Sequence, residues 1–218
     1  MTTTKRRGRP NPLDEENFQR IFLGQDSDNI LLSLVNAYHR YNDRTPGRYD
    51  NITYLDSTDS QIPSVHIRVN EPRYKDYKNI ELHVLKEEYL AGNFNEYWGK
   101  IMTDTIKGVD DYSVSGKVKK IYFADFDLFD NKRQYENAFS LNKSGFGNNI
   151  LDGGVTFIFY ELAKFRKMSE KKIRAEWTGE PFLKWLVFLN PSPNPQLLKE
   201  AILLDEDIKN AEERLHNS

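Results

Sequence analysis

The chain has 218 residues and a formal net charge of −2 at pH 7, with 38% hydrophobic and 29% charged residues. This composition is typical of a soluble folded domain, and the lack of cysteine excludes disulfides, thiolate metal sites and cysteine nucleophiles. No apolar run reaches the length of a membrane span and the basic N-terminus lacks a signal-peptide core, so we expect a cytoplasmic protein without a membrane partner.

The first residues are polar and basic and show no hydrophobic periodicity, which predicts a disordered tail over residues 1–12. The sequence RGRP within this tail resembles the AT-hook, whose arginines lie in the narrow minor groove of A·T-rich DNA. The candidate DNA contacts of the tail are Lys5, Arg6, Arg7 and Arg9. The motif is short and occurs once, which favours the alternative of a basic tail with no base preference.

Two helices are expected at the start of the domain. Residues 13–22 place apolar side chains at helical spacing, and residues 28–41 begin with Asp28 as a cap and carry a continuous apolar stripe. The predicted buried residues are Phe18, Ile21, Phe22, Ile30, Leu31, Leu34, Val35 and Tyr38. His39 lies beside this stripe and is expected to be a surface or hydrogen-bonded histidine and not a ligand. A short strand is predicted over residues 52–56.

Residues 64–70 and 79–86 predict two strands joined by a polar loop at 71–78. Polar and apolar side chains alternate along both strands, so each strand has one apolar and one polar face. If the strands pair as a hairpin, the polar residues gather on one side of the sheet as a candidate metal or acid–base cluster. The residues concerned are His66, Arg68, Glu81 and His83. The alternative is an amphipathic hairpin with a solvated polar face.

The second half of the chain predicts a long helix, three strands and two closing helices. The helix covers residues 87–108, the strands 117–129, 135–142 and 155–165, and the closing helices 169–190 and 195–216. We expect a core domain at 13–190, followed at 191–218 by an amphipathic helix that packs on the domain or on a partner chain, including a second copy. The order of elements indicates an α/β (α+β) fold with a mixed sheet and not a doubly wound nucleotide-binding fold.

Several sequence phrases in this order resemble the PD-(D/E)XK nuclease superfamily, and more narrowly the Rpn family of recombination-promoting nucleases and transposases. These phrases are ENFQRIF, NILLSLVNAY, NIELHV, FNEYWGKIMTDTIKGVDDY, KVKKIYFADFDLF, VTFIFYELAKF and FLKWLVFLN. The resemblance spans about residues 13–190. It implies a restriction-endonuclease-like core, in which a mixed sheet is flanked by helices, and it implies DNA as the partner.

The resemblance also implies a divalent ion, Mg²⁺ or Mn²⁺, held by an aspartate on one strand and a glutamate on the next, with Lys or Gln two positions later. Glu81 falls on the glutamate, whereas His66 stands at the aspartate position and His83 at the Lys/Gln position. A glutamine of the following helix falls on Asp104. Arg68 is a further candidate DNA contact.

Three functions stay open, the first two from this departure and the third from the acidic C-terminal helix. The first is a DNA-associated protein with a divergent site and weak or absent hydrolysis. The second is an active metal-dependent DNA endonuclease, in which His66, Glu81 and His83, with Asp104, hold a softer ion such as Mn²⁺ or Zn²⁺. The third is a protein-interaction or regulatory module without catalysis.

Overall fold

A mixed β-sheet forms the centre of the computed structural model, which describes residues 8–43, 48–55, 64–71, 76–90, 98–99, 118–141 and 155–217. Within these residues the sheet has six strands in the order β1-β2-β3-β4-β6-β5. They are β1 (Asn51–Tyr54), β2 (Ser64–Glu71), β3 (Asp76–Leu85), β4 (Val118–Ala124), β5 (Glu136–Leu141) and β6 (Val155–Glu161). The first three strands pair antiparallel, β3, β4 and β6 run parallel, and β5 is antiparallel to β6. The predicted mixed sheet is confirmed.

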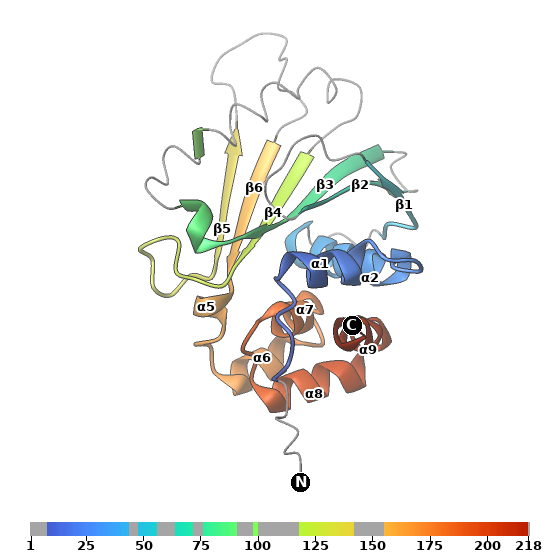
Figure 1. Cartoon of the computed structure of the whole chain (residues 1–218). Coiled ribbons are helices and arrows are strands. Elements are labelled where there is room, and N and C mark those ends of the chain that lie inside the picture. Colours follow the sequence, from blue (N-terminus) through green and yellow to red (C-terminus); the bar gives the residue numbers. More distant parts are fainter. Residues whose placement is uncertain are drawn as a thin grey trace.

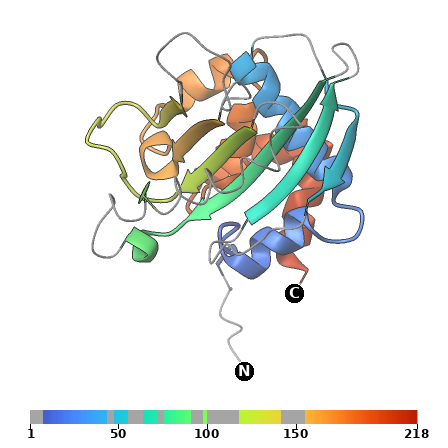
Figure 2. The ribbon, with the colours of Figure 1, turned by 90° about the horizontal axis from the view of Figure 1, so that it is seen from above.

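Helices pack in a layer beneath one face of this sheet (Figure 1), and Figure 2 shows the strands lying across that layer. They are α1 (Glu15–Phe22), α2 (Asp28–Asp43), α5 (Leu162–Phe165), α6 (Glu170–Glu176), α7 (Phe182–Leu189), α8 (Pro195–Leu204) and α9 (Glu206–His216). A short 3₁₀ helix, η1 (Glu87–Leu90), follows β3 outside this layer, and its Leu90 packs on the opposite face of the sheet. The predicted stripes of the first two helices are buried in the main core. No helix in the described part of the chain is long and apolar enough to cross a membrane.

The alternation of side chains divides the sheet into two surfaces with different partners. Ile67, Leu82 and Ile121 point to the helical layer and belong to the main core. The opposite surface carries a smaller aromatic core, centred on Tyr122 and Phe159, across β4 and β6. Both faces of these parallel strands are therefore buried, as is usual for central parallel strands.

Several predicted elements end earlier than expected because polar side chains terminate them. The strand predicted at 155–165 stops at Glu161, whose buried carboxylate accepts hydrogen bonds from the backbone N–H groups of Leu128 and Phe129 at 2.6 and 3.1 Å. Lys164 forms an ion pair with the same carboxylate at 2.6 Å, in the turn of helix α5. The strand predicted at 117–129 ends at Ala124, and Glu161 bonds to the segment that follows it.

The two long closing helices predicted from the sequence are each divided in two. The break between α6 and α7 contains Gly179 and Pro181, which interrupt helical hydrogen bonding. The break between α8 and α9 lies at Asp205, whose extended backbone allows its side chain to accept a hydrogen bond from the N–H of Ile208 as an N-cap. The hairpin loop is also shorter than predicted, because β3 already begins at Asp76.

Arg9 ties the N-terminal segment to the helical layer. Its guanidinium donates to both carboxylate oxygens of Glu212, with distances of 2.8 to 3.0 Å, and to the backbone oxygens of Phe188 and Asn190 at 2.8 and 3.2 Å. Its charge also lies over the Phe188 ring, 5.2 Å from the centroid. A DNA contact by Arg9 would require these bonds to break, so we assign Arg9 a structural role. Lys5, Arg6 and Arg7 lie outside the described residues.

We predict that Arg9→Ala lowers the free energy of unfolding by about 2 kcal/mol, because it leaves the half-buried Glu212 carboxylate without its bidentate partner. The free energy of unfolding of Arg9→Lys should lie between those of the parent and Arg9→Ala, because an ammonium cannot reproduce the paired hydrogen bonds of a planar guanidinium. Urea unfolding followed by circular dichroism measures this. The exposed Lys171→Ala is the control, expected within about 0.5 kcal/mol of the parent. Equal stability of Arg9→Ala and the parent would contradict the structural role.

Candidate metal centre

The strand register brings three polar residues from three neighbouring strands side by side. Glu81 on β3 lies directly opposite His66 on β2, and on its other side directly opposite Lys120 on β4. Residues in register share a face of the sheet, so these side chains all leave the sheet on the surface away from the main helical layer. His83 follows two positions after Glu81 and points the same way. The predicted gathering of His66, Glu81 and His83 is confirmed.

The side chains converge on one atom, the Oε2 oxygen of Glu81. The Nζ atom of Lys120 lies 2.8 Å from this oxygen, the Nε2 atom of His83 3.1 Å, and the Nε2 atom of His66 4.0 Å. Glu81 and His83 are almost fully buried, and the side chains of Lys120 and His66 are only 11% and 15% exposed. A single carboxylate oxygen is thus surrounded by one ammonium and two imidazoles.

Burial and the charges within the cluster together determine the protonation of its side chains. Burial alone would raise the pKa of Glu81, but the hydrogen bond from His83 and the charge of Lys120 outweigh it and hold the pKa below its ordinary value. Burial lowers the pKa of His66 to about 4, and the charge of Glu81 opposes that shift only in part. Burial also lowers the pKa of His83, against its hydrogen bond with Glu81. At neutral pH the cluster therefore holds one carboxylate and two neutral imidazoles.

The donor set fits a divalent transition ion. The candidate ligand atoms of His66, Glu81 and His83 all lie within 4.8 Å of one another. Tetrahedral zinc sites hold neighbouring donor atoms roughly 3.4 Å apart, a value between the 3.1 and 4.0 Å that separate the Nε2 atoms of His83 and His66 from Glu81 Oε2. His66 Nε2 and His83 Nδ1 are buried and have no hydrogen-bond partner among the described residues. Two histidines and one glutamate are also a known catalytic zinc set.

Lys120 is the member of this cluster that the sequence did not predict. Its strand carries two consecutive lysines, and alternation sends them to opposite faces. Lys119 lies over the ring of Tyr38 on the helical side, 5.3 Å from the centroid, whereas Lys120 reaches Glu81. A lysine inside an otherwise apolar strand was the available signal. The choice between the two depends on the pairing of β3 with β4, which local patterning does not give.

Stacked rings fix the orientation of His83. Its ring lies 4.7 Å from the ring of Tyr122 at an interplanar angle of 12°, and Tyr122 stacks in turn on Phe159 at 4.8 Å. These rings belong to three adjacent strands, so the column crosses the sheet into the smaller core. Because Tyr122 and Phe159 are buried, the imidazole has little freedom to turn away from Glu81.

The remaining sequence candidates lie elsewhere. Arg68 shares the face of the cluster but donates to the side chain of Asn79 at 3.1 Å, in a register pair farther along the hairpin. Asp104 lies outside the described residues. His39 is buried, and its Nδ1 atom is 3.3 Å from the Tyr49 hydroxyl, as expected for a hydrogen-bonded histidine.

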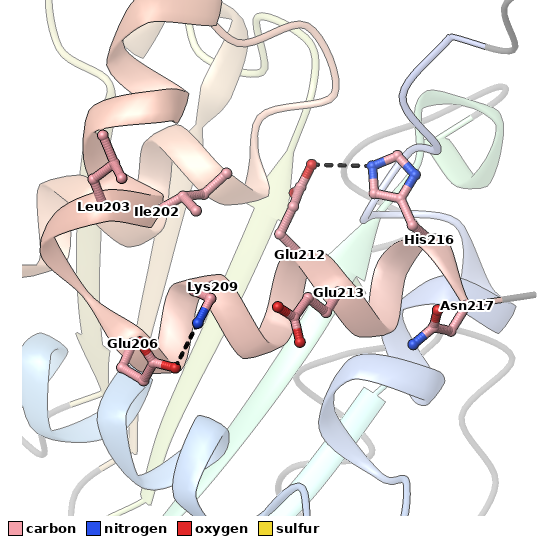
Figure 3. A pocket seen from close by; sticks show the side chains of 8 residues that line it. All are labelled: Ile202, Leu203, Glu206, Lys209, Glu212, Glu213, His216 and Asn217. Atoms are coloured by element: carbon pink, nitrogen blue, oxygen red, sulfur yellow. Dashed lines mark hydrogen bonds and ion pairs between the residues drawn. The ribbon is translucent and has the colours of Figure 1, made fainter.

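A surface pocket between α8 and α9 lies apart from the cluster (Figure 3). It is lined by Ile202, Leu203, Glu206, Lys209, Glu212, Glu213, His216 and Asn217. Two pairs across its rim are already formed within α9, Glu206 with Lys209 at 2.9 Å and Glu212 with His216 at 3.2 Å. No residue of the metal cluster lines this pocket, and it contributes nothing to the chemistry of the cluster.

The depressed pKa of His66 predicts a pH-dependent loss of stability in the metal-free protein. Between pH 6.5 and about 4 the unfolded chain binds a proton at His66 that the folded chain excludes, so stability falls as the pH is lowered through this window. His66→Gln removes this contribution. Between pH 7 and 4.5 its free energy of unfolding should therefore fall by about 2 kcal/mol less than that of the parent. Urea unfolding in EDTA at both pH values measures the difference. Parallel pH profiles for the two proteins would show that His66 is not excluded from protonation by folding.

Comparison with protein families identifies the family of this chain. The sequence model for PD-(D/E)XK nuclease family transposases covers residues 15–217, from the first helix to the end of the last. Searches of curated proteins and of solved structures found no match. The match includes all of the six-stranded sheet, the His66–Glu81–His83 cluster and both C-terminal helices. The chain belongs to the PD-(D/E)XK nuclease family of transposases.

Proposed function

We propose that this chain is a DNA-associated domain whose divergent nuclease site binds a divalent transition ion and hydrolyses DNA weakly. The observation that carries this proposal is the convergence of two neutral imidazoles and one lysine on the Oε2 oxygen of Glu81. The family membership supplies DNA as the expected substrate. Perturbed, buried ionisable groups that gather at one place are typical of functional sites.

The donor types favour Mn²⁺ or Zn²⁺ over Mg²⁺. Imidazole nitrogen suits transition ions, whereas Mg²⁺ prefers an octahedral shell of oxygens. The cluster offers Mg²⁺ a single carboxylate, since His66 and His83 provide nitrogen. Both histidines are neutral at pH 7 because burial lowers the pKa of each, so each imidazole carries one nitrogen lone pair without the net loss of a proton. Binding of an ion at Nε2 of His83 would move its proton from Nε2, where it bonds to Glu81, to Nδ1.

Each residue of the cluster would have a separate role in hydrolysis. A bound divalent ion supplies Lewis-acid polarisation of the phosphate and lowers the pKa of bound water. Glu81 provides the negative charge that attracts the ion, and His66 and His83 complete its ligand set. The family pattern has a lysine two positions after the glutamate, where this chain has His83. Lys120 brings an ammonium to the same carboxylate from the neighbouring strand β4, and this ammonium is suited to pair with a phosphate oxygen or to orient water.

Hydrolysis should be weak because, within the described part of the chain, the cluster contains one carboxylate. The ion at this site keeps more net positive charge than one held by an aspartate and a glutamate, and the one carboxylate is shared with Lys120. The positive charge that Glu81 leaves uncompensated on the ion is repelled by the ammonium of Lys120, and this repulsion disfavours binding of the ion. We therefore expect slow cleavage that depends strongly on the type of ion.

A non-catalytic DNA-binding scaffold is the second candidate, and the ion pair between Lys120 and Glu81 favours it. At 2.8 Å in a nearly buried site, the ammonium neutralises the carboxylate without any metal. In that case the fold serves binding alone. The two candidates differ in whether any divalent ion supports cleavage.

We predict that the purified protein nicks supercoiled plasmid slowly with Mn²⁺ and not measurably with Mg²⁺. Glu81→Gln should abolish nicking, because a direct ligand should matter at least as much as outer-shell partners, whose loss costs about 10- to 100-fold. Glu206→Gln, on the exposed surface of α9, is the matched control and should cleave normally. Gel assays in Mg²⁺, Mn²⁺ and Zn²⁺ measure the rates. Cleavage that survives in Glu81→Gln, or none with any ion, would remove the hydrolytic proposal.

The basic tail should provide phosphate contacts. Replacing Lys5, Arg6 and Arg7 with Gln should reduce the slope of log affinity against log salt by about 2 to 3, because each phosphate contact contributes about 0.9. Fluorescence anisotropy with a labelled duplex between 50 and 200 mM KCl gives the slope. Arg9 is kept in this variant because it anchors the segment to Glu212. An unchanged slope would discard the role of the tail and leave DNA binding to the folded domain.

A further inference from the structure

Lys120 contacts the carboxylate oxygen that a metal ion would bind. Its Nζ atom is 2.8 Å from Glu81 Oε2, which is also the oxygen nearest to His83 and His66. The ammonium reaches this oxygen from β4, on the opposite side of Glu81 from His66. Because the lysine side chain is only 11% exposed, water weakens this ion pair less than it would at the surface.

A dication and this ammonium repel each other when both lie close to the same carboxylate oxygen. A metal–oxygen bond is about 2.0–2.2 Å long, so an ion bound to Oε2 would lie within a few ångströms of Nζ, where two positive charges repel strongly at low dielectric. The carboxylate has one negative charge to share between them. Binding of the ion and pairing with Lys120 are therefore competing states of one site.

We infer that Lys120 is a built-in competitor of the metal ion. It neutralises Glu81 in the metal-free protein and leaves Glu81 when an ion binds, so it sets how much ion the protein needs before it becomes active. This inference rests on the proposed metal site and adds its regulation. The released ammonium stays tethered to β4 next to the site, where it is free to pair with a substrate phosphate.

The neighbouring lysine on the same strand offers a matched control. Lys119 and Lys120 carry the same charge one residue apart, but Lys119 faces the helical layer and lies over Tyr38. Removing either charge changes the net charge of the protein equally. Only Lys120→Met removes a cation that contacts Glu81, so a general electrostatic effect and direct competition give different results.

The test is the dissociation constant of Mn²⁺, measured by titration calorimetry or by electron paramagnetic resonance of the free ion, in the full chain. Lys120→Met should bind Mn²⁺ about tenfold more tightly than the parent, the usual size of such a coupling. Lys120→Arg, which keeps a cation at this position, should stay near the parent, and Lys119→Met should change affinity less than about twofold. Lys120→Gln serves if Lys120→Met does not fold.

A second readout is the thermal midpoint. Loss of the ion pair with Glu81 should lower the thermal midpoint of metal-free Lys120→Met, and saturating Mn²⁺ should raise it by more than in the parent. Affinity in Lys120→Met equal to or weaker than the parent would overturn the competitor role while leaving the metal site intact, provided Glu81→Gln abolishes binding to the parent. If neither the parent nor Lys120→Met binds Mn²⁺ through Glu81, the metal site and the competitor role both fail.

Discussion

The chemistry of this protein depends on one buried carboxylate and on the cations that neutralise it. Glu81 lies between β2 and β4 with its Oε2 atom in contact with Lys120 and His83 and near His66. A buried carboxylate is stable only when paired and hydrogen-bonded. The site therefore always requires a positive partner at Glu81, and the functional question is whether that partner is the ammonium of Lys120 or a metal ion. Both the metal preference and the proposed regulation follow from this constraint.

Packing on both sides of the sheet fixes the strand register and the orientation of the side chains in the cluster. Apolar residues that alternate with the cluster are buried against the helical layer, so a shift of register by one residue would bury Glu81 in the main core. The aromatic column of His83, Tyr122 and Phe159 supports the other side. In the helical layer, Arg9 links α7 to α9 by hydrogen bonds to the backbone oxygen of Phe188 and to the Glu212 carboxylate. The sheet is thus a rigid platform, and Lys120 is the side chain of the cluster with the most rotatable bonds.

The part of the site that could be predicted from the sequence is the part determined by local alternation. His66 and Glu81 lie on strands adjacent in sequence, so period-two patterning and a hairpin place them together. The partnership of Lys120 with Glu81 spans two parallel strands joined by a long connection, and its register depends on packing of the whole sheet. The helix order and mixed sheet were likewise predictable, whereas the end of β6 depended on Glu161 binding the backbone of a distant segment.

The most direct measurement of the central claim is anomalous X-ray diffraction from crystals of the protein soaked in MnCl₂. The account predicts a manganese peak bounded by His66, Glu81 and His83, with the Lys120 side chain turned away from Glu81. Crystals with no peak at this position, and with the Lys120 ammonium still bonded to Glu81 at millimolar Mn²⁺, would contradict it.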